Sequence, residues 1–358
     1  KALMANCRRR KTNMFAAWID YKKAYDSITH SWLIQSLKLV GVAKNIICFL
    51  QNAMKSWKTT LLIDNKEISK VSIKRGIFQG DSLSPLIFII AMRPLTMLLR
   101  NEGRGYSFET NCNKVNHLLY MDDLKIVTRT ERDLTALLNT VKLFSNDIKM
   151  SFGLKKCAIM RVNRGVVQHT EGIEMYDGEI IQNVSSEGYK YLGITEQGNI
   201  KHSHMKEKLS KEYSRRVKKI MKSKLNGHNK IKAVNTWAVP VILYSAGIVD
   251  WSDENLKNLD RRTRKIMTMD GILPQQCDVD RIYVHRELGG RGLTNLQECV
   301  YKECNSLFNR MEGDSEWWMK NVIKEGVIKR HDIEQIKKHE ERWKNKHSMA
   351  SSCETPKD

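Results

Sequence analysis

Two adjacent carboxylates interrupt an apolar run in residues 118–126, LLYMDDLKI. Tyr120 before them and Ile126 after them are good strand formers, and aspartate tolerates the turn between two strands. The pattern predicts a tight β-hairpin that holds Asp122 and Asp123 at its tip. Neighbouring carboxylates repel each other, so such a tip favours a bound cation, for which Mg²⁺ is the obvious candidate. For an isolated pair, the alternative is a surface hairpin whose aspartates face water.

A third carboxylate supplies a partner for this hairpin. Asp20 follows residues 15–19, an apolar run typical of a buried strand. A carboxylate at a strand end, aimed at a second one on a hairpin, suits a two-metal site with ions ~4 Å apart. Such a site activates an attacking hydroxyl and stabilises a leaving phosphate, and nucleotidyl transfer needs little more than positioning and charge neutralisation. That Asp20 meets Asp122 is a hypothesis at this point.

The charge of the chain indicates a polyanionic partner. The 358 residues include 61 Lys and Arg against 40 Asp and Glu, a formal net charge of +21. Nucleic acid is the usual partner for such an excess, with an anionic membrane surface as the competing interpretation. No lipidation motif and no apolar run of bilayer length supports a membrane. The eight cysteines lack zinc-like spacing and are predicted to be reduced thiols of an intracellular protein.

Much of the positive charge lies in residues 201–232, which hold twelve Lys and Arg but two Glu. Apolar side chains at every fourth position from Met205 to Met221 predict an amphipathic helix. Unpaired like charges repel, which favours a helix that follows a nucleic-acid backbone over a merely solvated one. The predicted nucleic-acid-binding residues are Lys208, Lys211, Arg215, Lys218, Lys219 and Lys222.

Five short motifs follow one another along the chain. They are residues 17–27 (AWIDYKKAYDS), 79–85 (QGDSLSP), 120–123 (YMDD), 153–157 (GLKKC) and 191–193 (YLG). In wording, order and spacing they resemble motifs A to E of the reverse transcriptases of non-LTR (LINE-type) retrotransposons. The resemblance is strong over residues 14–194 and weaker to about residue 298.

The resemblance implies an α+β fold: a polymerase palm, in which helices back an antiparallel sheet, followed by a helical thumb. The implied domains are a palm with partial fingers (1–198), a basic helical thumb (199–270) and a C-terminal helical extension (271–358). The implied activity is RNA-directed DNA polymerase, which copies retrotransposon RNA into DNA by target-primed reverse transcription. Implied partners are two Mg²⁺ ions (with Mn²⁺ as a substitute), an RNA template, a DNA primer and deoxynucleoside triphosphates, with no membrane. A nuclear location follows by analogy.

The resemblance also assigns roles to single residues. Asp20 and Asp122 would be metal ligands and catalytic residues, with Asp123 as a supporting carboxylate. Tyr21 would offer its backbone carbonyl to a metal. Lys156 would lie near the leaving pyrophosphate as a charge stabiliser or proton donor, with the neighbouring lysine at 155 as its rival.

The nucleotide and primer sites are assigned in the same way. Tyr25 would lie under the sugar, where its ring excludes a 2′-hydroxyl and selects deoxynucleotides. Gln79 and Gly80 would face the incoming nucleotide, since glycine allows close backbone approach and glutamine both donates and accepts hydrogen bonds. The primer grip would be Tyr191, Leu192 and Gly193.

One departure and three alternatives accompany this interpretation. Polymerases of this type carry a fingers region before motif A, whereas only thirteen residues precede Met14. We therefore expect an N-terminally truncated fragment without most of the fingers, and no endonuclease pattern is visible. The alternatives are a retroelement-derived nucleic-acid-binding protein without catalysis, an RNA-templated RNA polymerase, against which Tyr25 argues, and an intron-encoded or bacterial reverse transcriptase.

Overall fold

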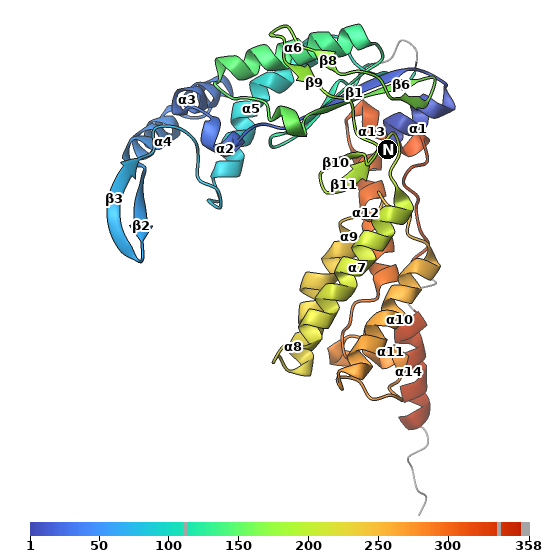
Figure 1. Ribbon diagram of the computed structural model, residues 1–358. Helices are drawn as coiled ribbons and strands as arrows, with labels where there is room; N and C mark the ends of the chain where they lie inside the picture. The colour runs from blue at the N-terminus through green and yellow to red at the C-terminus, as the bar shows by residue number, and fades with distance from the viewer. Residues whose placement is uncertain (110–112, 335–337, 352–358) are drawn as a thin grey trace, which may run out of the picture. The chain divides into compact units, whose positions relative to one another are not determined.

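The computed structural model describes residues 1–109, 113–334 and 338–351. The chain forms two compact units, one of residues 3–198 and one of residues 199–358 together with residues 1–2 (Figure 1). The first unit combines an antiparallel sheet with helices, and the described part of the second is helical. The predicted α+β class is therefore confirmed, while the division into palm, thumb and extension stays a prediction.

A five-stranded antiparallel sheet organises the first unit, and its central strand is the predicted buried one. The strand order is β4 (His117–Tyr120), β5 (Asp123–Thr128), β1 (Met14–Ile19), β6 (Ala158–Asn163) and β7 (Val166–Gln168). β1 lies between β5 and β6 and pairs with both. Because β1 is central and covered on both faces, its sequence is an almost unbroken apolar run.

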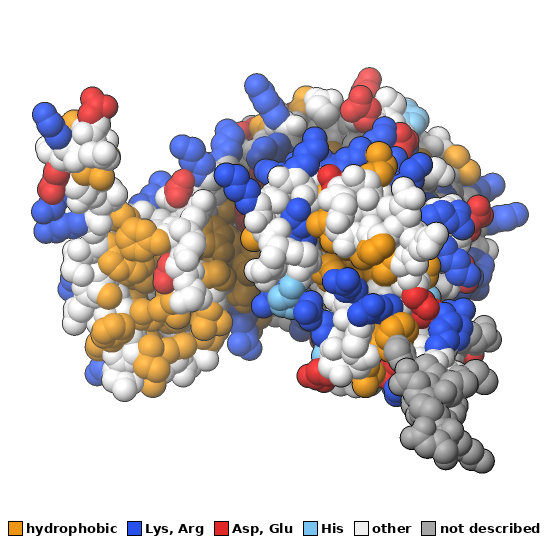
Figure 2. All heavy atoms as spheres, turned by 90° about the horizontal axis from the view of Figure 1, so that it is seen from below, with side chains coloured by type: hydrophobic (Ala, Val, Ile, Leu, Met, Phe, Trp, Pro, Cys, Tyr) orange, Lys and Arg blue, Asp and Glu red, His pale blue; other side chains and the backbone are white. Residues whose placement is uncertain are grey.

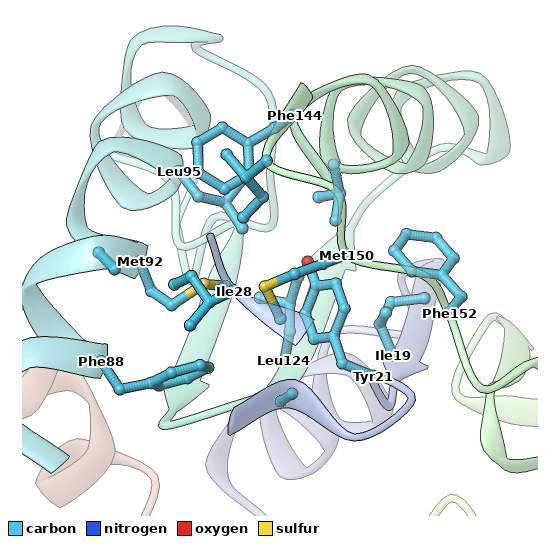
Figure 3. Packing of buried hydrophobic residues seen from close by; sticks show 14 of the residues in the cluster. Ile19, Tyr21, Ile28, Phe88, Met92, Leu95, Leu124, Phe144, Met150 and Phe152 are labelled. Carbon is cyan, nitrogen blue, oxygen red and sulfur yellow. The ribbon is translucent and has the colours of Figure 1, made fainter. Parts of the chain in front are cut away.

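Helices α5 (Ser84–Asn101) and α6 (Glu131–Asp147) pack on one face of this sheet. One buried cluster contains Phe88 and Leu95 from α5, Ile19 from β1, Leu124 from β5 and Phe144 from α6 (Figure 3). Burying each such side chain stabilises the fold by roughly 1.5–3 kcal/mol. Alternate strand residues point to the other face, which carries the site described below.

The start of α5 corrects a prediction. The sequence favours Ser84 as the residue that caps the helix, but Leu83 occupies that position and α5 begins at Ser84. The Asp81 carboxylate accepts hydrogen bonds from the Ser84 N–H at 3.2 Å and from its hydroxyl at 3.1 Å. Pro94 lies inside α5, as predicted. Helix α6 begins after Thr130, whose side chain accepts a hydrogen bond from the backbone N–H of the third helical residue.

The remaining elements of the first unit are short. The helix that follows motif A is α3 (His30–Leu39). Residues 58–72 form a hairpin of β2 (Lys58–Ile63) and β3 (Lys66–Ser72). Helix α4 (Lys44–Ser56) was not predicted from the sequence, although its buried residues 47, 50 and 54 have helical spacing. The others are α1 (Ala2–Arg9), α2 (Ala24–Ser27), η1 (Leu154–Lys156), β8 (Ile173–Glu174), β9 (Ile180–Ile181), β10 (Tyr189–Tyr191) and β11 (Ile194–Glu196).

The second unit begins with the predicted basic helix, α7 (His202–Met221). Met205, Tyr213, Val217 and Met221 are buried, so the four-residue apolar repeat is confirmed. A second basic helix of this unit is α10 (Asp253–Met269). The other helices are α8 (Gly227–Ala233), the π-helical turn η2 (Val234–Ala238), α9 (Val239–Leu243), α11 (Val279–Tyr283), η3 (Arg286–Leu288), α12 (Leu296–Gly313), α13 (Trp317–Lys324) and α14 (Lys338–Ser351).

Two further findings concern the chain as described. No helix in residues 1–109, 113–334 and 338–351 is both long enough and apolar enough to cross a membrane. The six cysteines in these ranges are free thiols. The predicted frayed tail at residues 350–358 lies mostly outside the described residues.

A buried carboxylate joins two helices of the second unit. Asp260 on α10 is 5% exposed, and its two oxygens lie 3.3 and 3.4 Å from the backbone N–H of Leu296, the first residue of α12. Burial raises the pKa of Asp260 from 3.8 to about 7, although the Leu296 hydrogen bond and Arg264 oppose the shift. The folded unit therefore retains a proton that the unfolded chain releases.

We expect the stability of the chain to depend on Asp260 as the pH changes. The pKa is higher in the folded state, so the free energy of unfolding should fall as pH rises from about 4 to about 7. A shift of about three units corresponds to roughly 4 kcal/mol. Asp260→Asn keeps an oxygen for the Leu296 N–H but cannot ionise, so urea unfolding of this variant should lose that pH dependence. The matched control is Asp270→Asn, at the exposed position that follows the last residue of α10; an equal change in both variants would contradict the assignment.

Candidate active site

The Asp-Asp hairpin forms, but only one aspartate occupies its tip. Tyr120 on β4 pairs with Asp123 on β5, which leaves Met121 and Asp122 as the two-residue loop. Met121 has a φ of 56°, the positive φ that such tight hairpins require. The prediction that both aspartates lie at the tip is therefore wrong for Asp123, which is the first residue of a strand and is held by the sheet.

The register of the sheet brings Asp20 to this hairpin. Trp18 pairs with Lys125 and Ile19 with Leu124. The next step of the same register sets Asp20 opposite Asp123, and directly opposite residues of antiparallel strands lie close together. Asp122, one residue earlier, is adjacent to both. The structure thus gathers three carboxylates that are about a hundred residues apart in the sequence.

Electrostatics at the site reflect this crowding. Burial raises the pKa of Asp122, and the charge of Asp20 raises it further. Burial also raises the pKa of Asp123, with additional contributions from the charges of Asp122 and Asp20. Lys156 acts in the opposite direction on both. A divalent cation would relieve the same repulsion more completely, because it brings two positive charges.

The backbone of the motif D segment fixes Asp20 in place. The Gly153 N–H donates to the Asp20 carbonyl at 2.7 Å, and the Asp20 N–H lies 3.5 Å from the Cys157 sulfur. A Cβ added at Gly153 would lie 2.9 Å from the Asp20 carboxylate oxygen Oδ1. Glycine at 153 therefore leaves the room that this carboxylate needs. The motif containing Gly153 is visible in the sequence, but the role of this glycine is not, because its close approach to Asp20 depends on tertiary structure.

Lys156 rather than Lys155 is the lysine that faces the carboxylates. Its ammonium nitrogen lies 3.5 Å from Asp20 Oδ1, while its side chain stays 74% exposed. At such exposure an ion pair contributes little to stability. Lys156 is therefore near the carboxylates and able to move.

The two tyrosines of motif A differ in burial and in position relative to the site. The Tyr21 side chain is buried, with its hydroxyl 2.9 Å from Ser145 Oγ, so it serves the core and leaves only its backbone for the site. Tyr25 is half-buried, and its ring stacks on Phe88 with centroids 4.8 Å apart. Burial raises the pKa of the Tyr25 hydroxyl, and the nearby charge of Asp122 adds to the shift. Tyr25 therefore borders the carboxylates.

The loop that carries Gln79 and Gly80 is tied to motif A at its start. The Gly76 N–H donates to the Ile28 carbonyl and the Ile77 N–H to the Tyr25 carbonyl, each at 2.8 Å. Gly76 has a φ of 84°, and a Cβ there would lie 2.9 Å from the Tyr25 carbonyl oxygen. Arg75 also donates to the Ser27 carbonyl. Gln79 and Gly80 themselves are exposed, with a φ of 96° at Gly80 that suits glycine.

The predicted primer grip is a hairpin packed on the site's face of the sheet. Leu192 and Gly193, with φ values of 45° and 80°, make the two-residue turn between β10 and β11. The Tyr189 ring stacks on Trp18 with centroids 4.9 Å apart. This contact places Tyr191, Leu192 and Gly193 on the same face as Asp20.

Lys125 holds this hairpin in place and was not singled out from the sequence. Its ammonium lies 4.7 Å from the ring centre of Trp18 and 5.4 Å from that of Tyr191, and it pairs with Glu196. Each cation–aromatic contact contributes on the order of 1 kcal/mol. The sequence does contain a signal for Lys125. A charged residue between the apolar Leu124 and Ile126 indicates that this face of the strand does not point into the hydrophobic core.

The six predicted nucleic-acid-binding residues of α7 all lie on the surface of the second unit. Two of them have acidic partners on the helix: Lys211 pairs with Glu207, and Arg215 pairs with Glu212. All six are exposed: Lys208, Lys211, Arg215, Lys218, Lys219 and Lys222.

The donor set fits a divalent cation that is shared with a substrate. Asp20, Asp122 and Asp123 offer the carboxylate oxygens that hard cations prefer. In the described part of the chain, no three His, Cys, Asp or Glu side chains form a ready-made metal site. Cations that also bind substrate phosphates and water do not need a closed shell of protein ligands.

Comparison with known proteins gives one family match. The family described as "Reverse transcriptase (RNA-dependent DNA polymerase)" matches residues 2–195, more than half of the chain. The Pol polyprotein of the type-1 retrotransposable element R2 of Popillia japonica is 24% identical over 289 residues, which cover 78% of this chain and 46% of that protein. That of the type-2 element R2DM of Drosophila melanogaster is 22% identical over 290 residues, which cover 79% and 27%. The chain thus spans less than half the length of these relatives.

Among solved structures, telomerase from Candida albicans in complex with a fragment of telomeric RNA aligns with 88% of this chain and 50% of that one. The TM-score is 0.42 and the sequence identity 13%.

Two substitutions should shift the carboxylate pKa values in opposite directions. Asp20→Asn removes a negative neighbour and should lower the pKa of Asp122 and Asp123; Lys156→Gln removes a positive one and should raise both. Carbon-13 NMR titration of the aspartate carboxyl groups without divalent metal measures these values. Lys155→Gln is the matched control and should have the smaller effect. Equal effects of the two lysine variants would show that Lys156 does not face the site.

Proposed function

Because this chain belongs to the reverse transcriptase (RNA-dependent DNA polymerase) family, we propose that it is the polymerase region of a non-LTR retrotransposon protein and extends a DNA primer along an RNA template. The observation that carries the proposal is the meeting of Asp20, Asp122 and Asp123 at one end of the sheet, with Lys156 beside them. The R2 retrotransposable-element polyproteins among its relatives support the retrotransposon assignment. The proposal includes target-primed synthesis, in which genomic DNA supplies the primer.

Reverse transcriptases generally depend on divalent metal, and the proposal assigns two Mg²⁺ ions here, with Mn²⁺ as a substitute. Asp20 and Asp122 would hold the ions, assisted by Asp123 and by the Tyr21 carbonyl. When bound, such ions activate the primer hydroxyl and neutralise charge on the reacting phosphate. By holding the ions, the carboxylates would fix the positions of the triphosphate and the primer end, and such positioning is most of what this chemistry requires of a protein.

Residues around the carboxylates would select and process the nucleotide. Tyr25, whose ring is held by Phe88, would lie against the sugar and exclude a 2′-hydroxyl, the group that distinguishes RNA from DNA precursors. Gln79 and Gly80 would face the nucleotide. Lys156, close to Asp20 yet exposed, would neutralise the leaving pyrophosphate or give it a proton.

Nucleic acid would be held by two surfaces. Tyr191, Leu192 and Gly193 would contact the primer strand near the carboxylates. The exposed cations of α7 would follow the template–primer backbone, which gives binding without sequence preference and with steep salt dependence. Figure 2 shows Lys and Arg side chains spread widely over the face in view, with few Asp and Glu among them. With genomic DNA as primer, the protein would act in the nucleus.

Primer extension tests the proposal directly. The chain should extend a DNA primer on an RNA template with deoxynucleotides and Mg²⁺, and EDTA should stop the reaction. Asp122→Asn should lower the rate at least about a hundredfold, because it removes part of the metal's several kcal/mol of charge stabilisation. Ribonucleotides used as well as deoxynucleotides would indicate an RNA polymerase. Nucleic-acid binding that persists in EDTA without extension in Mg²⁺ would indicate a binding protein.

The close approach of Gly153 to Asp20 leads to a second prediction, which primer extension can also test. Gly153 has a negative φ of −84°, so the backbone does not demand glycine, but an alanine methyl would press on the Asp20 carboxylate. Gly153→Ala should therefore lower the extension rate about tenfold or more while thermal unfolding changes little, as displaced catalytic groups are costly. Gly227→Ala is the control, because nothing lies within 4 Å of its Cβ. A Gly153→Ala enzyme of normal rate would contradict the steric argument.

A further inference from the structure

An exposed tryptophan interrupts the helical segment that packs beside α7. Trp237 lies in the π-helical turn η2 and is 38% exposed, whereas Val234 and Ala238 of the same turn are buried. Tryptophan combines a large apolar ring with a polar N–H, so a partly exposed indole can bind a partner that covers its ring. π-Helical turns are rare and frequently coincide with functional sites.

Cationic side chains of α7 surround this indole. The Arg216 guanidinium lies 5.1 Å from the ring centre of Trp237 and donates to the Trp237 carbonyl at 2.8 Å. Glu212 holds the same guanidinium through an ion pair of 2.8 Å. These contacts fix the indole in one orientation. The exposed Lys219, one turn further along α7, places its ammonium 5.9 Å from the same ring.

Further aromatic and cationic side chains lie near Trp237. Tyr244 follows Trp237 by seven residues, which places both on one face of the helical segment, and it is 61% exposed. The neighbouring surface of α7 carries Lys218 and Lys222, both exposed. In the described part of the chain, no carboxylate lies within ion-pair distance of Lys219. The surface therefore suits a partner that is both polyanionic and aromatic.

We propose that Trp237 is a stacking platform for an unpaired base of single-stranded nucleic acid, with Lys219 as a neighbouring phosphate contact. Along a duplex only the cations of this surface find a partner, the phosphate backbone, because the bases inside are already stacked and paired. An unpaired nucleotide satisfies both features, since its base has a free π-face and its backbone is anionic. The inference rests on the proposed function, in which template and primer strands have unpaired stretches, and it adds a contact that distinguishes them from the duplex.

Binding of the full chain to two fluorescein-labelled probes tests this inference. One probe is an unstructured oligonucleotide of mixed sequence, and the other is a duplex several times longer, so that its two exposed terminal base pairs are a small fraction of its binding sites. Trp237→Leu removes the π-face and should raise the Kd for the single strand about tenfold, as expected for one stacked base, with little change for the duplex. Trp237→Phe keeps a ring and should have a smaller effect. The matched control is Trp318→Leu in α13, a half-buried tryptophan of the same unit, which should leave both Kd values unchanged.

Three results would overturn the inference: an unchanged Kd for the single strand, an equal loss for both probes, or an equal loss in the Trp318 variant. If Trp237→Leu does not fold, intrinsic tryptophan fluorescence of the wild type and of Trp237→Phe tests the inference instead. Saturating single strand should quench part of the intrinsic fluorescence, and Trp237→Phe should show less quenching than the wild type; equal quenching would also overturn the inference.

Failure of this inference and failure of the proposed function give different results. A wild-type chain that extends primers, together with a Trp237→Leu variant that binds normally, refutes only the stacking platform. A wild-type chain that extends nothing in Mg²⁺, together with a selective single-strand loss in the variant, supports the platform and refutes the polymerase.

Discussion

The antiparallel pairing of β1 with β5 is the constraint on which the site depends. Its register sets Ile19 against Leu124 on the core face, and one residue further it sets Asp20 against Asp123. A slip of one residue would turn the core residues to the opposite face, so hydrophobic burial fixes the register and thereby the carboxylates. The same apolar cluster that stabilises the unit therefore sets the spacing of the candidate catalytic groups.

The carboxylates are held together at some cost in stability. Burial and mutual repulsion both raise the pKa values of Asp122 and Asp123, and the exposed Lys156 offsets only part of this. The surrounding structure keeps them in place through backbone contacts: the Gly153 N–H fixes the Asp20 carbonyl, and the start of the Gln79 loop is tied to Tyr25. Strain of this kind is typical of functional sites, where the missing stabilisation comes from a bound ligand.

The second unit combines a buried apolar stripe with surface charge in another way. Every fourth residue of α7 faces the unit's core, which leaves its cations on the surface as a consequence of helical periodicity. Trp237 departs from that scheme, because a π-helical turn leaves a large aromatic ring exposed among these cations. The exposed part of this ring is available to a partner outside the unit.

The sequence by itself determined the α+β class, the central strand ending at Asp20, the helices after Thr130 and through Met205, and the identity of the carboxylates. These features depend on local periodicity or on short motifs, which are readable without knowledge of distant contacts. Only the tertiary structure decided that Asp122 alone occupies the hairpin tip, that Lys156 faces Asp20, and that Gly153 leaves room for its carboxylate. Each of these depends on how segments far apart in the chain are packed against one another, and a side chain's neighbours across such a contact leave no local pattern in the sequence.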